Sequence, residues 1–331
     1  MVGTGTLTDV EPNREDRSVT RLGLWLTGPW PAPAGKGPAD GAESAGGTDR
    51  TGATGPSVLN GVAALAEMAE QSGFDSLWVT DDVASSDPDS SGNPAPEAYS
   101  LLGALAARTH SARLGALPIG VDRRHPSIVA KVITGIDVIS HGRGVLTYGL
   151  GVADVGRGER LIEALRVGRA LLKDEVPTVE GTFYSVVEAM NRPSPVQDGG
   201  IPIAVFVEHH ADLATVAVTE FMGLADVVIV EGRTGDVGQV ADSVHSVPWV
   251  QRLDDRRGAG PLRVIGIAPK VSMPPSGASA DSDGGSLVAR TVRAIRDLFG
   301  AGVDGCIVPV DLSTPPEVVA AIGTGLGDGL A

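Results

Sequence analysis

Two adjacent aspartates, Asp81 and Asp82, follow a short apolar run that has the composition of a buried strand. A carboxyl group is normally ionised at neutral pH and then cannot donate a proton. Burial, or a second carboxylate at close range, raises the pKa of one group of such a pair, so that it can hold a proton. If both side chains face one cleft, the pair predicts general acid–base chemistry; the alternative is a capped turn.

Basic side chains gather after another apolar run, at Arg123, Arg124 and His125. Guanidinium groups bind phosphate and carboxylate groups, so this cluster predicts an anion site; the alternative is pairing with acidic groups of the protein itself. His209 and His210 follow a third run. Zinc binding is disfavoured there because neighbouring side chains in a loop point apart, so we expect no metal site.

Lys270 follows a further strand-like run and is a candidate Schiff-base nucleophile if it is desolvated. A solvated loop lysine is the alternative, and the neighbouring Pro269 and Met273 favour it. A cofactor-free lyase or hydrolase would depend on Lys270 together with the carboxylates. We therefore keep this chemistry as a minor alternative.

The segment 113–151 shows how such residues are positioned. Residues 114–120 are apolar and bounded by turn residues, which predicts a buried strand. His125-Pro126 opens a helix, because proline at the first helical position loses only an N–H that has no partner within the helix. A second apolar strand follows at 145–150. A strand, a helix and a strand with short connections predict a parallel pair of strands.

Strand-like runs and helical patterns alternate along the whole chain. This order predicts an α/β fold, most simply a (β/α)8 barrel. An open doubly wound sheet is the alternative, and it is disfavoured because no glycine-rich fingerprint joins the first strand to the first helix. We expect a disordered tail at 1–17 and a single barrel domain at 18–331, with flexible loops at 27–56, after the first strand, and at 272–285. Because barrel sites lie at the C-terminal ends of the strands, the residues that follow the strands are the site candidates.

The chain has 331 residues, a formal net charge of −15 and one cysteine. Nucleic-acid binding is disfavoured because it needs a basic surface. No apolar run approaches the length that spans a membrane, and residues 1–17 lack a signal-peptide pattern, so we expect no membrane partner. A single cysteine allows no intrachain disulfide, which fits a cytoplasmic protein.

Several stretches, in this order and spacing, resemble the luciferase-like flavin and deazaflavin oxidoreductases, the bacterial luciferase-like monooxygenase superfamily. The densest are GFDSLWVTDD at 73–82, LGALPIGVDRRHPSIVAK at 114–131 and DVISHGRGVLTYGLG at 137–151. Shorter ones are GERLIEALRVGRALL at 158–172, EGTFYSV at 180–186 and RPSPVQDGGIPIAV at 192–205. The resemblance covers most of the chain and implies a TIM-barrel fold.

The resemblance also implies hydride transfer through FMN or the deazaflavin coenzyme F-420, laid over the barrel mouth, to or from a small organic substrate. We favour the deazaflavin because VDRRHPSIVAK, at 121–131, looks most like those members. Asp82 would be the catalytic acid or base, and Asp81 its partner. The cofactor would lie against residues at the strand ends: Gly120, Val121, His125, Gly149, Gly151 and His209.

Three departures from the family pattern favour an alternative. Members usually carry an Asp-His or Glu-His pair where this chain has Asp81 and Asp82, and usually a glycine-rich turn where it has VEHH at 207–210. The segment 151–159 is also shorter than usual. A catalytically impaired barrel, serving as a non-catalytic subunit of a homo- or heterodimer, would show such changes. An FMN-dependent monooxygenase is the second alternative.

Overall fold

The structure, a computed structural model, describes residues 20–28, 55–81, 96–117, 120–121, 123–149, 156–173, 176–197, 199–208, 223–246, 262–272 and 280–326. The strands in these ranges are β1 (Leu22–Thr27), β2 (Ser76–Thr80), β3 (Arg113–Leu117), β4 (Leu146–Gly149), β5 (Ile203–Val207), β6 (Val227–Val230), β7 (Arg263–Ile267) and β8 (Gly305–Asp311). The helices are α1 (Gly55–Gln71), α2 (Ala98–Ala106), α3 (Pro126–Ile139), α4 (Arg157–Lys173), α6 (Thr234–Ser246), α7 (Ala280–Gly300) and α8 (Pro316–Leu326).

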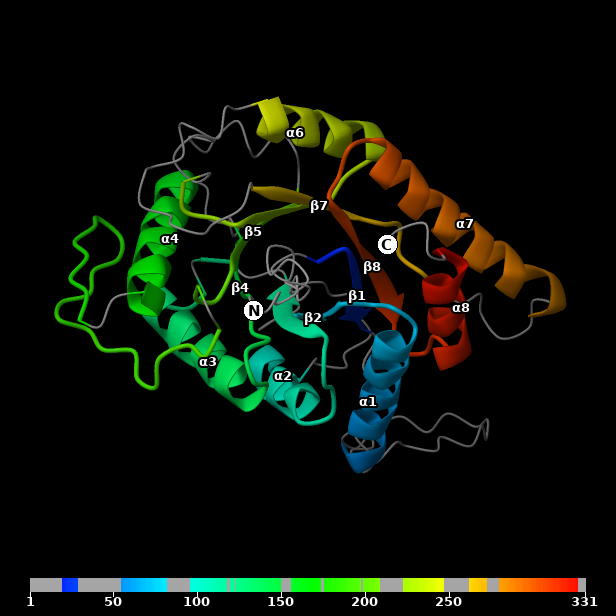
Figure 1. Cartoon of the computed structure of the whole chain (residues 1–331), viewed down its shortest axis with the longest axis horizontal. Helices are drawn as coiled ribbons and strands as arrows, with labels where there is room; N and C mark the ends of the chain where they lie inside the picture. Colours follow the sequence, from blue (N-terminus) through cyan, green and yellow to red (C-terminus); the bar gives the residue numbers. More distant parts are fainter. Residues whose placement is uncertain are drawn as a thin grey trace, which may run out of the picture.

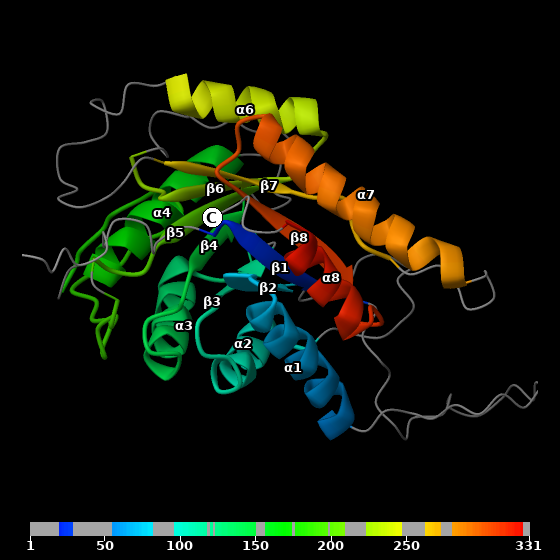
Figure 2. The same cartoon turned by 45° about the vertical axis from the view of Figure 1, so that its right-hand side comes forward.

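All paired strands are parallel, in the order β3-β2-β1-β8-β7-β6-β5-β4. The two ends of this order, β3 and β4, meet through bridges between Leu114 and Gly144 and between Gly120 and Gly149. The helices surround the strands (Figure 1), and a turned view shows α8 between α1 and α7 (Figure 2). This arrangement confirms the predicted (β/α)8 barrel.

Apolar side chains pack on both faces of the strands, because successive side chains of a strand point to opposite faces. The inner cluster is made of Trp25, Trp78, Leu117, Val145, Ala204, Phe206, Val227, Ile229, Ile265, Ile267 and Ile307. The outer cluster packs between the strands and the helices. Trp78 lies opposite Gly115, where an added Cβ would approach the indole ring to 2.3 Å. Glycine at position 115 therefore leaves the space that the indole fills.

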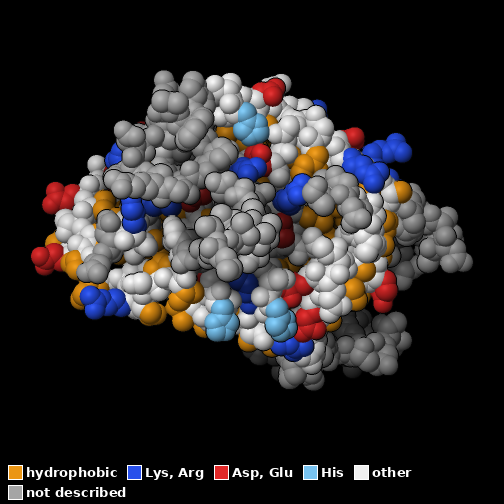
Figure 3. Space-filling model, in the orientation of Figure 1, with side chains coloured by type: hydrophobic (Ala, Val, Ile, Leu, Met, Phe, Trp, Pro, Cys, Tyr) orange, Lys and Arg blue, Asp and Glu red, His pale blue; other side chains and the backbone are white. Residues whose placement is uncertain are grey.

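The described surface carries acidic and basic side chains in small separate groups on the face shown in Figure 3. Apolar side chains are visible over α3, along the lower edge of that view. Ile128 and Ile139 of α3 are each 54% exposed. Exposed Met190 and Val196 belong to the segment 176–197, which is hydrogen-bonded to α3 through the Val196 N–H and the Asp137 carboxylate.

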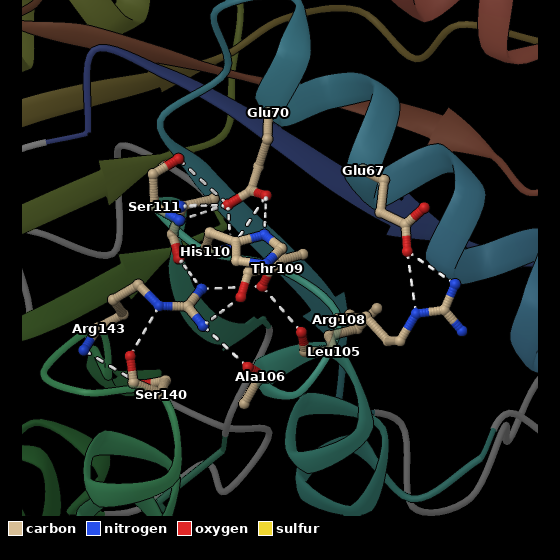
Figure 4. Close-up of polar contacts among 11 residues, drawn as sticks. Glu67, Glu70, Leu105, Ala106, Arg108, Thr109, His110, Ser111, Ser140 and Arg143 are labelled. Atoms are coloured by element: carbon tan, nitrogen blue, oxygen red, sulfur yellow. Dashed lines mark hydrogen bonds and ion pairs between the residues drawn. The ribbon is translucent and has the colours of Figure 1, made fainter.

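Two charged side chains tie together the loops at the N-terminal ends of the strands (Figure 4). Glu70, near the end of α1, accepts hydrogen bonds from the backbone N–H groups of His110, Ser111 and Ala112 at 2.7–2.9 Å. The Arg143 guanidinium donates to the carbonyl oxygens of residues 106, 109 and 112, and so links the segments before β3 and β4. In a barrel, this end of the strands supports stability rather than chemistry.

Two predicted loops are shorter than the sequence indicated. Helix α1 begins at Gly55 and α7 begins at Ala280, inside the predicted loops 27–56 and 272–285. Glycine, serine and aspartate predicted a loop at 280–285, but a helix draws most of its stability from the packing of its other turns and can extend through weak helix formers. The predicted tail 1–17 and residues 29–54 and 273–279 lie outside the described residues.

Candidate functional site

Asp81 follows β2, but its side chain faces the layer between the strands and the helices. Trp78 belongs to the inner cluster and Val79 to the outer one, so alternation places Thr80 inward and Asp81 outward. Asp81 is 3% exposed, and its carboxylate lies 2.5 Å from Nη1 of Arg124. Asp81 therefore pairs with Arg124 and does not face the barrel interior. The predicted acid–base pair required both aspartates to face one cleft, and Asp81 does not meet that requirement.

Arg124 joins three elements at this point. Beyond Asp81, its guanidinium contacts the carboxylate of Glu97, the N-cap of α2, at 3.1 Å, and it lies over the Tyr99 ring at 5.3 Å from the centroid. Burial raises the pKa of the Asp81 carboxyl, and the Arg124 charge opposes that rise. The sequence predicted either an anion site or pairing with acidic groups of the protein, and for Arg124 the structure shows the pairing.

Three of the predicted cofactor residues meet at the seam between β3 and β4, defined here as Gly120, Val121 and Gly149. Gly120 bridges to Gly149, and the Val121 N–H donates to the Gly149 carbonyl oxygen at 3.2 Å. Neither glycine carries a side chain, so a flat ring can approach this backbone closely.

A buried hydroxyl lies next to the seam. Thr147, two residues before Gly149, alternates with outward-facing Leu146 and Tyr148 and so points into the barrel. Its hydroxyl is buried without a hydrogen-bond partner among the described residues. An unpaired buried hydroxyl is unfavourable, and a polar edge of a bound ring would satisfy it. The described part of the seam therefore fits a flavin-type ring.

A fourth predicted cofactor residue, His125, lies close to the seam as the N-cap of α3, which confirms the predicted start of this helix. Its ring packs edge-on against Tyr184, with 5.4 Å between the centroids. The Tyr184 hydroxyl donates to the Val121 carbonyl oxygen. Sequence reasoning missed Tyr184, although an aromatic side chain with a polar tip in the stretch EGTFYSV was a signal for such an anchor.

Lys270 lies after β7, beside the ends of β1 and β8. Its Nζ is 2.6 Å from the Asp311 carboxylate and donates to the Gly28 carbonyl oxygen at 3.3 Å. A Schiff-base nucleophile needs a desolvated amine, whereas the Lys270 side chain is 45% exposed and ion-paired. The structure thus disfavours the lyase or hydrolase alternative.

Three site candidates, Asp82, Gly151 and His209, lie outside the described residues. Within the described ranges, no group of three histidine, cysteine, aspartate or glutamate side chains is placed to hold a metal ion. No helix in the same ranges is long and apolar enough to cross a membrane.

Comparison with known proteins connects this barrel to named relatives. The sequence profile described as luciferase-like monooxygenase matches residues 41–225. The F420-dependent glucose-6-phosphate dehydrogenase of Microbacterium testaceum (strain StLB037) is 35% identical over 151 residues, which are 42% of this chain and 44% of that protein. The 5,10-methylenetetrahydromethanopterin reductase of Methanolobus tindarius is 36% identical over 90 residues, 27% of this chain and 24% of that protein. The chain thus spans less than half the length of these curated relatives.

Solved structures share the fold over nearly the whole chain. An F420-dependent secondary alcohol dehydrogenase, in complex with an F420-acetone adduct, superposes with a TM-score of 0.61 at 15% identity, covering 94% of this chain and 99% of that chain. The EDTA monooxygenase EmoA from Chelativorans sp. BNC1 superposes with a TM-score of 0.66 at 14% identity, covering 93% of each. Since the matching profile covers more than half of the sequence, the chain belongs to the luciferase-like monooxygenase family.

Proposed function

We propose that this chain is an oxidoreductase that transfers a hydride through coenzyme F-420 or FMN, to or from a small organic substrate. The observation that carries the proposal is the pair of bridged glycines, Gly120 and Gly149, in the seam of a luciferase-like barrel. The seam lies at the C-terminal ends of β3 and β4, the end of a barrel where active sites are found.

The cofactor ring, in this proposal, lies against the seam backbone, with the Thr147 hydroxyl at a polar edge of the ring. Exposed Arg123 and His125, just beyond the seam, would meet the anionic tail. Once bound, the cofactor would supply the hydride donor or acceptor. The protein would hold the ring, exclude water from it and manage one proton.

Asp82 is the proposed acid or base for that proton, and Asp81 is its positioning residue. The Asp81 N–H donates to the Leu117 carbonyl oxygen at 2.7 Å, while its carboxylate is held by Arg124. Both contacts fix the backbone directly before Asp82. Asp81 would therefore support Asp82 through the chain rather than by sharing a proton with it.

The deazaflavin is the favoured cofactor. Several glucose-6-phosphate dehydrogenases that resemble this chain are named for F420, at 35% and 32% identity in two cases. FMN-dependent oxygenation is the alternative, supported by the family description and by a structural neighbour, a type II Baeyer-Villiger monooxygenase in complex with FMN.

A homodimer is the assembly that we propose, through the apolar face of α3. Ile128 and Ile139 are both half-exposed there, and apolar patches of this kind commonly mark protein contacts. Light scattering of the wild type and of I128E/I139E tests this contact. A dimeric wild type and a monomeric variant are expected, whereas a dimeric variant rejects α3 as the contact surface.

The proposed function is tested by titrating the purified chain with oxidised F-420 and, separately, with FMN, while fluorescence and visible absorption are recorded. Saturable quenching by one of them is expected. If the fluorescence of neither cofactor is quenched, the proposal is rejected, and a dimer that binds neither cofactor favours the non-catalytic subunit.

A further inference from the structure

We propose that Glu163 and Tyr184 are positioning residues for the seam that the cofactor ring would contact. They act through the hairpin 179–186. This hairpin is closed by two backbone hydrogen bonds between Val179 and Val186, at 2.8 and 2.9 Å. The inference rests on the proposed function for its effect on cofactor binding, whereas the contacts themselves are independent of it.

The Glu163 carboxylate, on α4, organises the tip of the hairpin. It accepts hydrogen bonds from three consecutive backbone N–H groups, those of Thr182 at 2.8 Å, Phe183 at 2.7 Å and Tyr184 at 2.9 Å. Burial opposes the charge, but these N–H groups outweigh it and lower the pKa of Glu163. The tip is therefore held by an ionised acceptor, which makes stronger hydrogen bonds than a neutral one.

Two glycines allow α4 and the hairpin to come this close. A Cβ on Gly181 would lie 2.5 Å from Oε2 of Glu163. A Cβ on Gly156 would lie 2.8 Å from the Phe183 ring, over which the Arg160 guanidinium stacks at 4.2 Å from the centroid. The tip is thus clamped between Glu163 on one side and the start of α4 on the other.

Tyr184 connects the hairpin to the seam. Its side chain is buried, its hydroxyl donates to the Val121 carbonyl oxygen, and its ring packs against His125. The Val121 N–H donates in turn to the Gly149 carbonyl oxygen. Val121 is therefore fixed by β4 through its N–H and by the hairpin through its carbonyl, and the hairpin depends on Glu163.

Breaking either link should loosen the seam without removing a residue that faces the proposed ring. A single hydrogen bond of this kind changes an equilibrium by about five- to tenfold. We accordingly expect Glu163→Gln and Tyr184→Phe each to weaken cofactor binding by about that factor. Tyr184→Phe keeps the ring and its packing, so it isolates the hydroxyl and remains informative if the Glu163 variant does not fold.

The experiment compares both variants with Glu70→Gln and Glu159→Gln in the full chain. Glu70 also accepts three consecutive backbone N–H groups, but at the other end of the barrel, so it controls for lost stability. Glu159 is exposed on α4 and controls for lost charge. The two readouts are hydrogen–deuterium exchange of peptides covering 120–127 and the Kd for F-420 and for FMN from fluorescence titration.

For Glu163→Gln and Tyr184→Phe only, we expect faster hydrogen–deuterium exchange at 120–127. In the same two variants we expect about five- to tenfold weaker cofactor binding, which is the effect of losing one hydrogen bond. Wild-type exchange at 120–127 in both variants overturns the inference, and so does an equal loss of affinity in Glu70→Gln. If the wild type binds neither cofactor, the proposed function fails, and the exchange data still decide whether the hairpin positions the seam.

Discussion

Glu70 and Glu163 lie at opposite ends of the barrel, yet each carboxylate accepts hydrogen bonds from three consecutive backbone N–H groups. Glu70 holds the segment before β3, far from the mouth. Glu163 holds a hairpin whose Tyr184 reaches the seam. The same local chemistry therefore serves the stability of the fold at one end and the proposed site at the other, and the two contributions can be measured separately.

Glu70→Gln should make the stability of the protein less sensitive to acid. Burial raises the pKa of Glu70, but its three N–H donors outweigh burial and bring the pKa below the ordinary value of a glutamate. A carboxyl group with a lowered folded-state pKa stabilises the fold above its unfolded-state pKa, and this contribution is lost as the pH falls through the folded-state pKa. We expect the variant to be about 1–3 kcal/mol less stable at neutral pH.

Urea unfolding of the wild type and Glu70→Gln at neutral pH and at about pH 3 measures this effect. The difference in unfolding free energy should shrink at the lower pH. A difference of the same size at both pH values would show that the charge of Glu70 is not the source.

Arg124→Met should destabilise the protein more at high pH than at low pH. The variant leaves the buried Asp81 carboxylate without its cation, which costs about 3–5 kcal/mol when the carboxylate is ionised. Burial already raises the pKa of Asp81, and removal of Arg124 raises it further. A carboxyl group with a raised folded-state pKa contributes stability below its unfolded-state pKa and loses it as the pH rises through the folded-state pKa.

Chemical denaturation at about pH 5 and about pH 8 tests the Arg124 prediction, with Asp81→Asn/Arg124→Met as the partner variant. The double variant should recover part of the loss, because it no longer buries an unpaired charge. Equal losses at both pH values, with no recovery in the double variant, would contradict the ion pair.

Two glycine-to-alanine changes should have opposite effects on stability. Gly115→Ala should destabilise by about 1–3 kcal/mol, because its Cβ would approach the Trp78 ring to 2.3 Å. Gly61, in α1, has open space at its Cβ position, so Gly61→Ala should stabilise by up to about 1 kcal/mol through helix propensity. Thermal unfolding compares the two, and Trp78→Phe should relieve the first. A Gly115→Ala variant as stable as the wild type would refute the packing.

The barrel could be predicted from the sequence because its signals are local. Apolar runs with turn residues at their ends mark the strands, and His125-Pro126 marks the start of α3 correctly. The start of α7 was missed because its first turn is rich in weak helix formers, and only the packing of later turns decides that the helix extends there.

The site could be predicted only in part. Gly120, Val121 and Gly149 were named from the family resemblance, and the structure brings them together because strand ends meet at one end of a barrel. Their part in cofactor binding stays a prediction. The direction of the Asp81 side chain follows from that of Trp78, because side chains alternate along a strand. If Trp78 points into the barrel, Asp81, three residues later, points toward the helices. The local alternation at 178–186 indicates a hairpin, but it does not show what the hairpin contacts. The contacts of Tyr184 with Glu163 and with Val121 could not be predicted, because they join positions 21 and 63 residues apart.

The proposed cofactor site is tested most directly by parallel equilibrium titrations of wild type and Gly120→Val with F-420 and with FMN, followed by fluorescence quenching. A valine side chain would occupy the space over the seam, and Gly61→Ala, on α1, is the matched control. We predict saturable binding of one cofactor by the wild type and by Gly61→Ala, and at least about tenfold weaker binding by Gly120→Val. Equal affinity of Gly120→Val, or no binding of either cofactor by the wild type, would contradict the proposal that this seam holds a flavin-type ring.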